Sequence, residues 1–95
     1  MSVTHSNLKT HSPPFALPSG IHQVFFSGTV ADGVDQPSLQ LLVNGGFRDL
    51  DPPVKFSQAD AGGVKQAKIP AGAQQVRWTV PNGKHLISTS ITQVA

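Results

Sequence analysis

The sequence contains no cysteine, no glutamate, no tyrosine and no long run of apolar residues. Without cysteine there is neither a disulfide framework nor a thiolate metal site to stabilise a small domain. Residues 1–14 hold no apolar stretch of the kind found in signal peptides, so we expect synthesis in the cytoplasm and no signal peptide. No segment approaches the roughly 20 apolar residues that span a bilayer, so we also expect no membrane insertion.

The composition indicates one small all-β domain. A chain of 95 residues forms a single domain with a small core. Good helix formers are scarce, whereas Ser, Thr, Gln, Gly and Pro are plentiful, which is typical of strands and turns. The seven Lys and Arg residues stand singly along the chain, and this spacing argues against a nucleic-acid partner.

Alternating apolar and polar residues predict a small antiparallel β-sandwich of about six or seven strands over residues 15–95. Residues 1–14 lack this alternation and end in Ser12-Pro13-Pro14, so we interpret them as an extended N-terminal arm. A short strand is expected at 64–69, although its alternation is poor. The sequence therefore predicts a sandwich domain preceded by an arm.

Turn residues mark the expected ends of several strands. Asn44-Gly45-Gly46 predicts a tight turn because Asn and Gly tolerate positive φ. The segment VPNGKH at 80–85 predicts a β-hairpin between the strands on either side of it. Asp51-Pro52-Pro53 is expected to end one strand before a short strand that carries Val54 and Phe56.

One stretch of the sequence is repeated. The segment LPSGIHQVFFS at 17–27 returns as IPAGAQQVRWT at 69–79. In each, a proline fixes φ, a glycine two places later permits a sharp turn, and an alternating strand follows. Each strand then reaches a glycine turn, TVADG at 29–33 and TVPNG at 79–83, and a return strand follows. We expect two sheets, each supplying one of these hairpins to a shared core, with Val24, Phe26, Val76 and Trp78 pointing inward. Chance similarity in so biased a composition is the alternative.

The repeat also assigns the outward residues. Phe25 aligns with Arg77, and Ile21 aligns with Ala73, so the first copy carries an apolar pair on its outer face. One small sandwich cannot bury such a pair in addition to its core. We expect the arm, through Phe15, another subunit or a ligand to cover it. Phe15, Ile21 and Phe25 are therefore the candidate partner-binding residues.

No set of residues forms a recognisable catalytic or metal-binding pattern. Serine, histidine and aspartate are present, but no Gly-x-Ser-x-Gly elbow accompanies them, so we expect no catalytic residue, no cofactor and no enzyme. The four histidines lack metal-binding spacing, and His22 and His85 are expected to be solvated or hydrogen-bonded surface residues. The aspartates at 32–35 and 49–51 match no calcium loop and are explained by turn chemistry.

Phe47 and Arg48, in the segment GGFRD, form a possible ligand loop. Two glycines precede the aromatic ring and a guanidinium follows it, a combination suited to recognition of a ligand. The alternative is that Phe47 closes one end of the sandwich.

Two functions follow from these residues. The first is a non-enzymatic structural protein, a subunit of a larger symmetric assembly such as a viral particle, of the decoration or connector type. It would reside in that particle and contact copies of itself or other subunits through the arm and the Ile21–Phe25 face. The second is a carbohydrate-binding, lectin-like β-sandwich that uses Phe47, Arg48 and the Asp-rich loops to bind a glycan.

Overall fold

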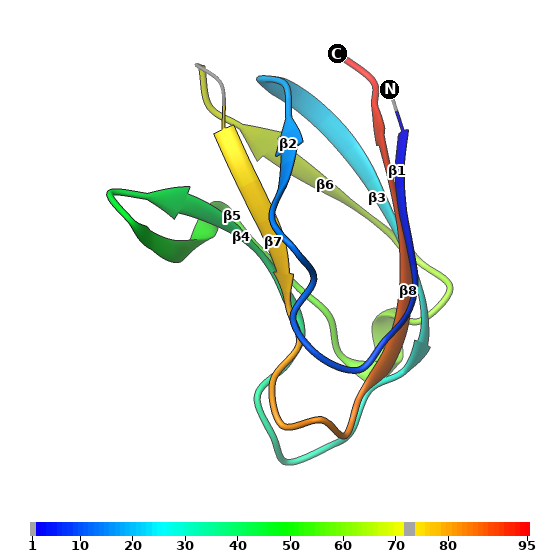
Figure 1. Ribbon diagram of the computed structural model, residues 1–95. Coiled ribbons are helices and arrows are strands. Elements are labelled where there is room, and N and C mark those ends of the chain that lie inside the picture. Colours follow the sequence, from blue (N-terminus) through cyan, green and yellow to red (C-terminus); the bar gives the residue numbers. More distant parts are fainter. Residues whose placement is uncertain (1, 72–73) are drawn as a thin grey trace.

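The computed structural model describes residues 2–71 and 74–95 and shows an antiparallel β-sandwich of two four-stranded sheets (Figure 1). Sheet A has the strand order β1-β8-β3-β6, and sheet B has the order β2-β7-β4-β5. The elements are β1 Ser2–Leu8, β2 Phe15–Leu17, β3 Gly20–Thr29, β4 Ser38–Val43, β5 Gly46–Lys55, the 3-10 turn η1 Gln58–Asp60, β6 Val64–Ile69, β7 Gln74–Thr79 and β8 Leu86–Gln93. The predicted all-β sandwich is confirmed, but it has eight strands where about six or seven were expected.

One of the additional strands comes from the segment interpreted as an arm. Residues Ser2–Leu8 form β1, which pairs antiparallel with β8 at the edge of sheet A. Further along, Ser12 N–H donates to the Trp78 carbonyl, and the Trp78 N–H donates to Ser12 Oγ, both at 2.9 Å. The segment therefore lies along its own sandwich. The sequence did not predict this strand because its inward residues, Val3, His5 and Leu8, include a histidine and show no clear apolar alternation. These residues are only partly buried.

The repeated segments supply one inner strand to each sheet. β3 lies between β8 and β6 in sheet A, and β7 lies between β2 and β4 in sheet B. Val24, Val76 and Trp78 are 0% exposed and Phe26 is 2% exposed, so the predicted inward face is confirmed. Gly72 and Ala73 of the second copy lie outside the described residues.

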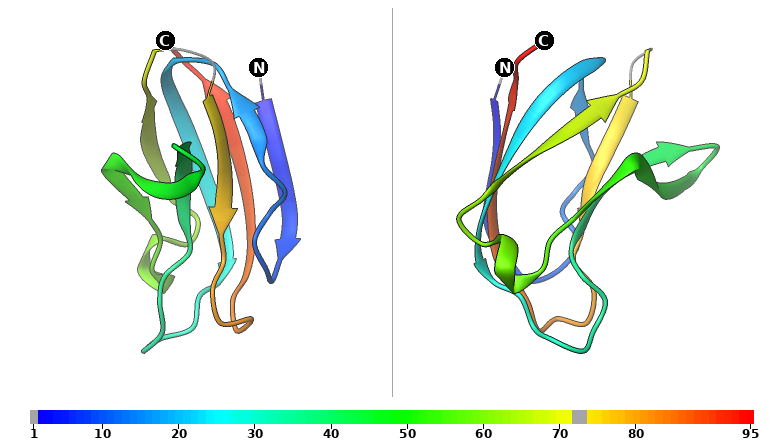
Figure 2. Two further views of the ribbon diagram at one scale, coloured as in Figure 1. Left: turned by 60° about the vertical axis from the view of Figure 1, so that its left-hand side comes forward. Right: turned by 180° about the vertical axis from the view of Figure 1, so that it is seen from behind.

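The strands that follow the repeats cross to the opposite sheet. From β3 the chain passes over 30–37 to β4 in sheet B, and from β7 it passes over 80–85 to β8 in sheet A (Figure 2). The predicted hairpins at these two places are therefore wrong. Asn82 and Gly83 do adopt positive φ, 68° and 61°, as a tight turn requires. A tight turn of this kind does not specify in which sheet the next strand pairs.

The loop between β4 and β5 is a true hairpin, and it projects away from the sandwich (Figure 1). Asn44 and Gly45 turn the chain with φ of 50° and 82°, as predicted. The expected break at Asp51-Pro52-Pro53 is wrong, because β5 continues through it to Lys55. The pairing of β4 shifts from Leu39–Val54 to Gln40–Asp49, so residues 50–53 form a bulge without partners in β4, and prolines are tolerated there.

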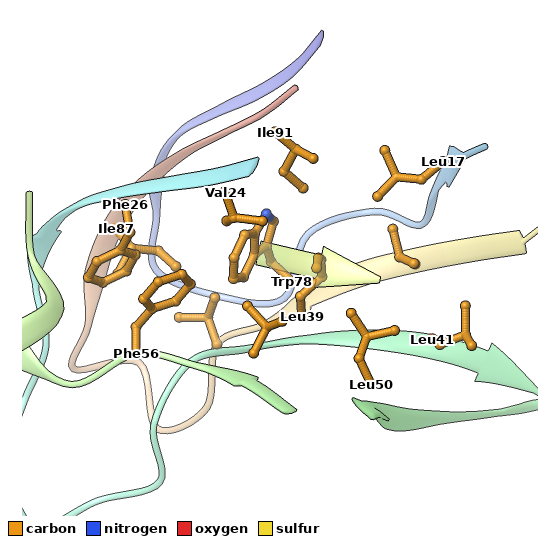
Figure 3. Close-up of a cluster of buried hydrophobic side chains, with 14 of the residues drawn as sticks. Leu17, Val24, Phe26, Leu39, Leu41, Leu50, Phe56, Trp78, Ile87 and Ile91 are labelled. Carbon is orange, nitrogen blue, oxygen red and sulfur yellow. The ribbon is translucent and has the colours of Figure 1, made fainter. Parts of the chain in front are cut away.

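The core is centred on three aromatic rings from both sheets and the segment between them (Figure 3). Phe26 stacks on Phe56 with ring centroids 4.0 Å apart, and Phe56 lies 5.6 Å from Trp78. Leu39, Ile87 and other aliphatic side chains surround these rings. Trp78 is therefore a core residue. In the described part of the chain, no helix has the length and apolar character needed to cross a membrane.

Candidate functional site

The outer face of sheet A is the candidate site. Because neighbouring residues of a strand point to opposite sides, each strand of this sheet contributes every second residue to the outer face. The side chains on this face are Ser2, Thr4 and Ser6 of β1, Leu86, Ser88, Ser90 and Thr92 of β8, Ile21, Gln23, Phe25, Ser27 and Thr29 of β3, and Val64, Gln66 and Lys68 of β6. Lys68 is the single charged member of this set. The face therefore differs from an ordinary solvated surface.

An apolar pair, Phe25 and Val64, lies within this face, and Ile21 lies on the same face of β3 beyond Gln23; we call these three residues the Phe25 patch. Phe25 is 46% exposed, and Val64, its direct partner in β6, is 49% exposed. Ile21 is half-buried and lies four residues before Phe25 on the same face of β3. The sequence identified Ile21 and Phe25 but missed Val64, because the poor alternation of 64–69 did not show which of its residues point outward.

Phe15, the third predicted residue, does not join this patch. It lies in β2 of sheet B, pairs with Val76, and packs half-buried against the core. Its ring lies 4.8 Å from the ring of His5 in β1. Partial burial of the imidazole lowers the pKa of His5 below its ordinary value. Phe15 therefore joins the segment 2–8 to the body of the sandwich instead of covering Phe25.

A shallow hollow of about 350 Å³ lies beside Phe25. Small side chains and glycines make up most of its lining, and His5 and two aromatic residues complete it: Thr4, His5, Ser6, Phe25, Phe26, Ser27, Gly62, Gly63, Ser88, Thr89 and Ser90. The small side chains of β1 and β8 leave this space open next to the larger ring of Phe25. The outer face thus offers both an apolar projection and an adjacent recess.

The turn at 57–63 holds one wall of this hollow against β3. The Gly62 N–H donates to the Phe26 carbonyl at 2.7 Å, and the Phe26 N–H donates to the Gly63 carbonyl at 3.2 Å. Asp60 fixes the turn, since its Oδ2 accepts the Ser57 backbone N–H at 2.8 Å. That hydrogen bond favours the carboxylate and lowers the pKa of Asp60.

Two histidines are buried and support loops. His22 is 1% exposed and donates from Nε2 to the Pro18 carbonyl at 2.9 Å. His85 is 0% exposed; its Nδ1 accepts the Ala31 N–H at 3.0 Å and its Nε2 donates to the Asp35 carbonyl at 2.8 Å. The expectation of surface histidines is wrong, because the loops fold over them. Within residues 2–71 and 74–95, no group of three metal-ligating side chains forms.

The outer face of sheet B contrasts with that of sheet A because it is charged. The Phe47 ring lies over the Arg77 guanidinium, 4.2 Å from ring centroid to Cζ. Arg48 is exposed and points to the opposite side of β5, so the two residues of the predicted ligand loop do not share a face. Phe47 is half-buried on this outer face and does not close an end of the sandwich.

A polar cleft of about 510 Å³ lies further along the same face of sheet B. Thr79 Oγ1 donates to Gln40 Oε1 at 2.7 Å, and Gln40 Nε2 donates to Asp49 Oδ1 at 3.1 Å. The Lys55 ammonium lies 3.4 Å from the second oxygen of Asp49. These polar groups contact one another and form a polar surface that the sequence did not reveal.

Comparison with known protein families, with curated proteins and with solved structures finds no match for this chain.

Proposed function

We propose that this protein is a non-enzymatic assembly protein, a small β-sandwich subunit of a larger symmetric assembly such as a viral particle. The observation that supports this proposal is the exclusion of charge from the outer face of sheet A. The chain has seven basic and five acidic residues, yet among the residues that the structure describes only Lys68 lies on the strands of that face with its side chain outward. Depletion of charge with an exposed aromatic residue at the centre is typical of the core of a protein–protein interface.

The Phe25 patch provides the apolar centre of this interface. Phe25 and Val64 lie side by side, and each leaves nearly half of its surface in contact with water. Fully burying a large apolar side chain contributes about 1.5–3 kcal/mol, and each of these half-exposed side chains has roughly half of that still to gain. The surrounding serine and threonine hydroxyls form hydrogen bonds without the desolvation cost of a charged group. A neighbouring subunit is therefore the partner that fits this face best.

Light scattering over a range of protein concentrations tests this role. We expect the wild-type chain to associate, and Phe25→Ser to weaken the association by at least tenfold without unfolding the subunit. Val43→Ser is the matched control, because Val43 is also apolar and 36% exposed but lies at the tip of the β4–β5 hairpin. A wild-type chain that remains monomeric at high concentration contradicts the proposal, and so does equal weakening by the two substitutions.

The polar cleft of sheet B supports a second candidate, a glycan-binding module. Gln40, Asp49 and Thr79 present amide, carboxylate and hydroxyl groups in fixed positions, and Phe47 lies two residues from Asp49 on the same face. Sugars are bound by such polar groups beside an aromatic ring. A glycan array separates the two functions: a specific sugar that is lost on both Phe47→Ala and Asp49→Ala favours this candidate, whereas no sugar hit removes it.

A further inference from the structure

The four edge strands of the sandwich differ in how they are protected against pairing with another chain. A free edge exposes unpaired N–H and C=O groups, and proteins block such edges with prolines, charges, short strands or a covering segment. The edges are β1 and β6 in sheet A, and β2 and β5 in sheet B.

Three of these edges carry recognisable protection. β5 contains Pro52 and Pro53 and four charged side chains, and its bulge interrupts the strand. β2 has only three residues and is followed directly by Pro18. β6 carries Lys65 and Lys68, and Lys65 Nζ donates to the Lys55 carbonyl of β5 at 2.7 Å, which bridges that side of the sandwich. Edge-to-edge pairing is therefore disfavoured at all three.

β1 has none of this protection along its regular part. Its seven residues, Ser2–Leu8, include no proline, lysine, arginine or aspartate. The strand is regularly paired with β8 from Ser2 to His5, and a shift in register follows near Asn7, which has φ of 55°. In the part of the chain that the structure describes, the ladder of sheet A ends at β1. The regular part thus presents an open hydrogen-bonding edge.

We propose that β1 pairs antiparallel with β1 of a second copy of this chain, joining two copies of sheet A into one continuous sheet. This inference rests on the proposed assembly role and names its first contact. A second copy fits as the partner because β1 carries no Lys, Arg or Asp side chain, so self-pairing of β1 brings no such charges opposite one another. Self-pairing of β6, by contrast, would bring lysines of the two copies close together. The two-fold arrangement closes the edges of both subunits at once.

The geometry of a two-fold axis determines which residues meet. An axis perpendicular to the sheet keeps both outer faces on the same side, so the outward residues Ser2, Thr4 and Ser6 pair among themselves. An axis at Thr4 places Thr4 opposite its own copy and Ser2 opposite Ser6 of the second copy. Hydroxyl pairs of this kind are favourable across antiparallel strands. Both Phe25 patches then lie on one face of the joined sheet and remain free for further contacts.

Single cysteines test this pairing directly, because the chain has no cysteine of its own. We would make Ser2→Cys, Thr4→Cys and Ser6→Cys and treat each purified full-length chain with a short bismaleimide. We expect crosslinked dimers, most abundant for Thr4→Cys. Gln66→Cys is the matched control, since Gln66 is exposed on the same outer face but lies on the opposite edge strand, and it should crosslink at least tenfold less. No β1 variant exceeding this control would overturn the inference.

A charge substitution provides an independent test. Thr4→Lys places an ammonium opposite its own copy across the axis, and we expect it to weaken the dimer by at least tenfold, while Gln66→Lys leaves it unchanged. Thr4 is exposed, so circular dichroism should show both variants folded. An unchanged dimer in Thr4→Lys would also overturn the inference.

The test separates this inference from the proposed function. If Thr4→Cys crosslinks but Phe25→Ser leaves the association unchanged, the β1 dimer stands and assembly through the Phe25 patch fails. If Phe25→Ser weakens association but no β1 cysteine crosslinks above the control, the patch stands and the β1 pairing fails. If both hold, Phe25→Ser in the Thr4→Cys background still yields crosslinked dimers but no larger species.

Discussion

The two Pro-x-Gly segments have similar inner faces and different outer faces. Phe26 and Trp78 meet the same central ring, Phe56, from opposite sheets. At the preceding position, Phe25 is exposed on sheet A, whereas Arg77 lies beneath Phe47 on sheet B. Core packing restricts the inner residues of both segments, since interiors are close-packed. The outer faces are free of this restriction, and each sheet has acquired its own surface chemistry.

The largest expected effect tests the shared inner face. Phe26→Ala and Trp78→Ala each remove a ring from the stack around Phe56, and we expect each to lower the free energy of unfolding by about 3–5 kcal/mol. Chemical denaturation monitored by circular dichroism measures this loss. A loss below about 0.5 kcal/mol in either variant, the ordinary range for surface residues, would show that the two segments are not equivalent inside.

The two buried histidines give a second comparison, since His22 lies within the first segment and His85 lies in the loop that follows the second. His85 makes two hydrogen bonds that hold the loop after β3, whereas His22 makes one, to Pro18. His85→Ala leaves the Ala31 N–H without its acceptor, so we expect a loss of about 1–3 kcal/mol. His22→Ala should cost less. Thermal unfolding of the two variants side by side measures the difference, and a greater loss for His22→Ala would contradict this account.

Exchanging the outer residues tests whether the two faces are independent of the fold. Phe25→Arg should change the free energy of unfolding by less than about 0.5 kcal/mol, because the side chain is exposed. The same variant should lose self-association. Arg77→Phe removes the contact with Phe47 and should cost about 0.5–1 kcal/mol. If Phe25→Arg instead prevents folding, Phe25 is part of the core and the contrast between the faces disappears.

The smallest expected effect concerns the side of the sandwich where β1 meets β2. Burial lowers the pKa of His5 below 6.5, so the unfolded chain binds a proton more readily than the folded chain. The contribution of His5 to stability is therefore present above pH 6.5 and is lost as the pH falls through the lowered pKa. His5→Gln should flatten this part of the dependence of unfolding free energy on pH. Identical pH profiles for the two chains would show that His5 is as hydrated as in the unfolded state.

The sequence predicted the strands whose residues alternate most clearly. Val24, Phe26, Val76 and Trp78 follow a strict period of two because both sheets bury them completely, so their direction was readable. The tight turn at Asn44-Gly45 was readable for a similar reason, since it requires positive φ. These features depend on neighbouring residues alone.

The pairing of strands was not readable, because it depends on residues distant in the sequence. The turn at Asn82-Gly83 satisfies the rules for a hairpin, yet Thr79 pairs with Ser38 and Leu86 with Thr29. Segment 2–8 was missed because Val3 is its only strongly apolar inward residue before Leu8. Val64 was missed because the alternation of 64–69 is poor, so the sequence identified only Ile21 and Phe25 of the Phe25 patch.

The crossings between the sheets have a consequence for biosynthesis. The inner strand β3 is paired with β8, so the centre of sheet A joins residues near the beginning of the chain to residues 86–93. While the ribosome is still adding β8, one side of β3 has no partner, and its apolar residues cannot yet be enclosed. We therefore expect sheet A to form only after β8 has emerged, and until then the apolar residues of β3 stay exposed and are prone to aggregate.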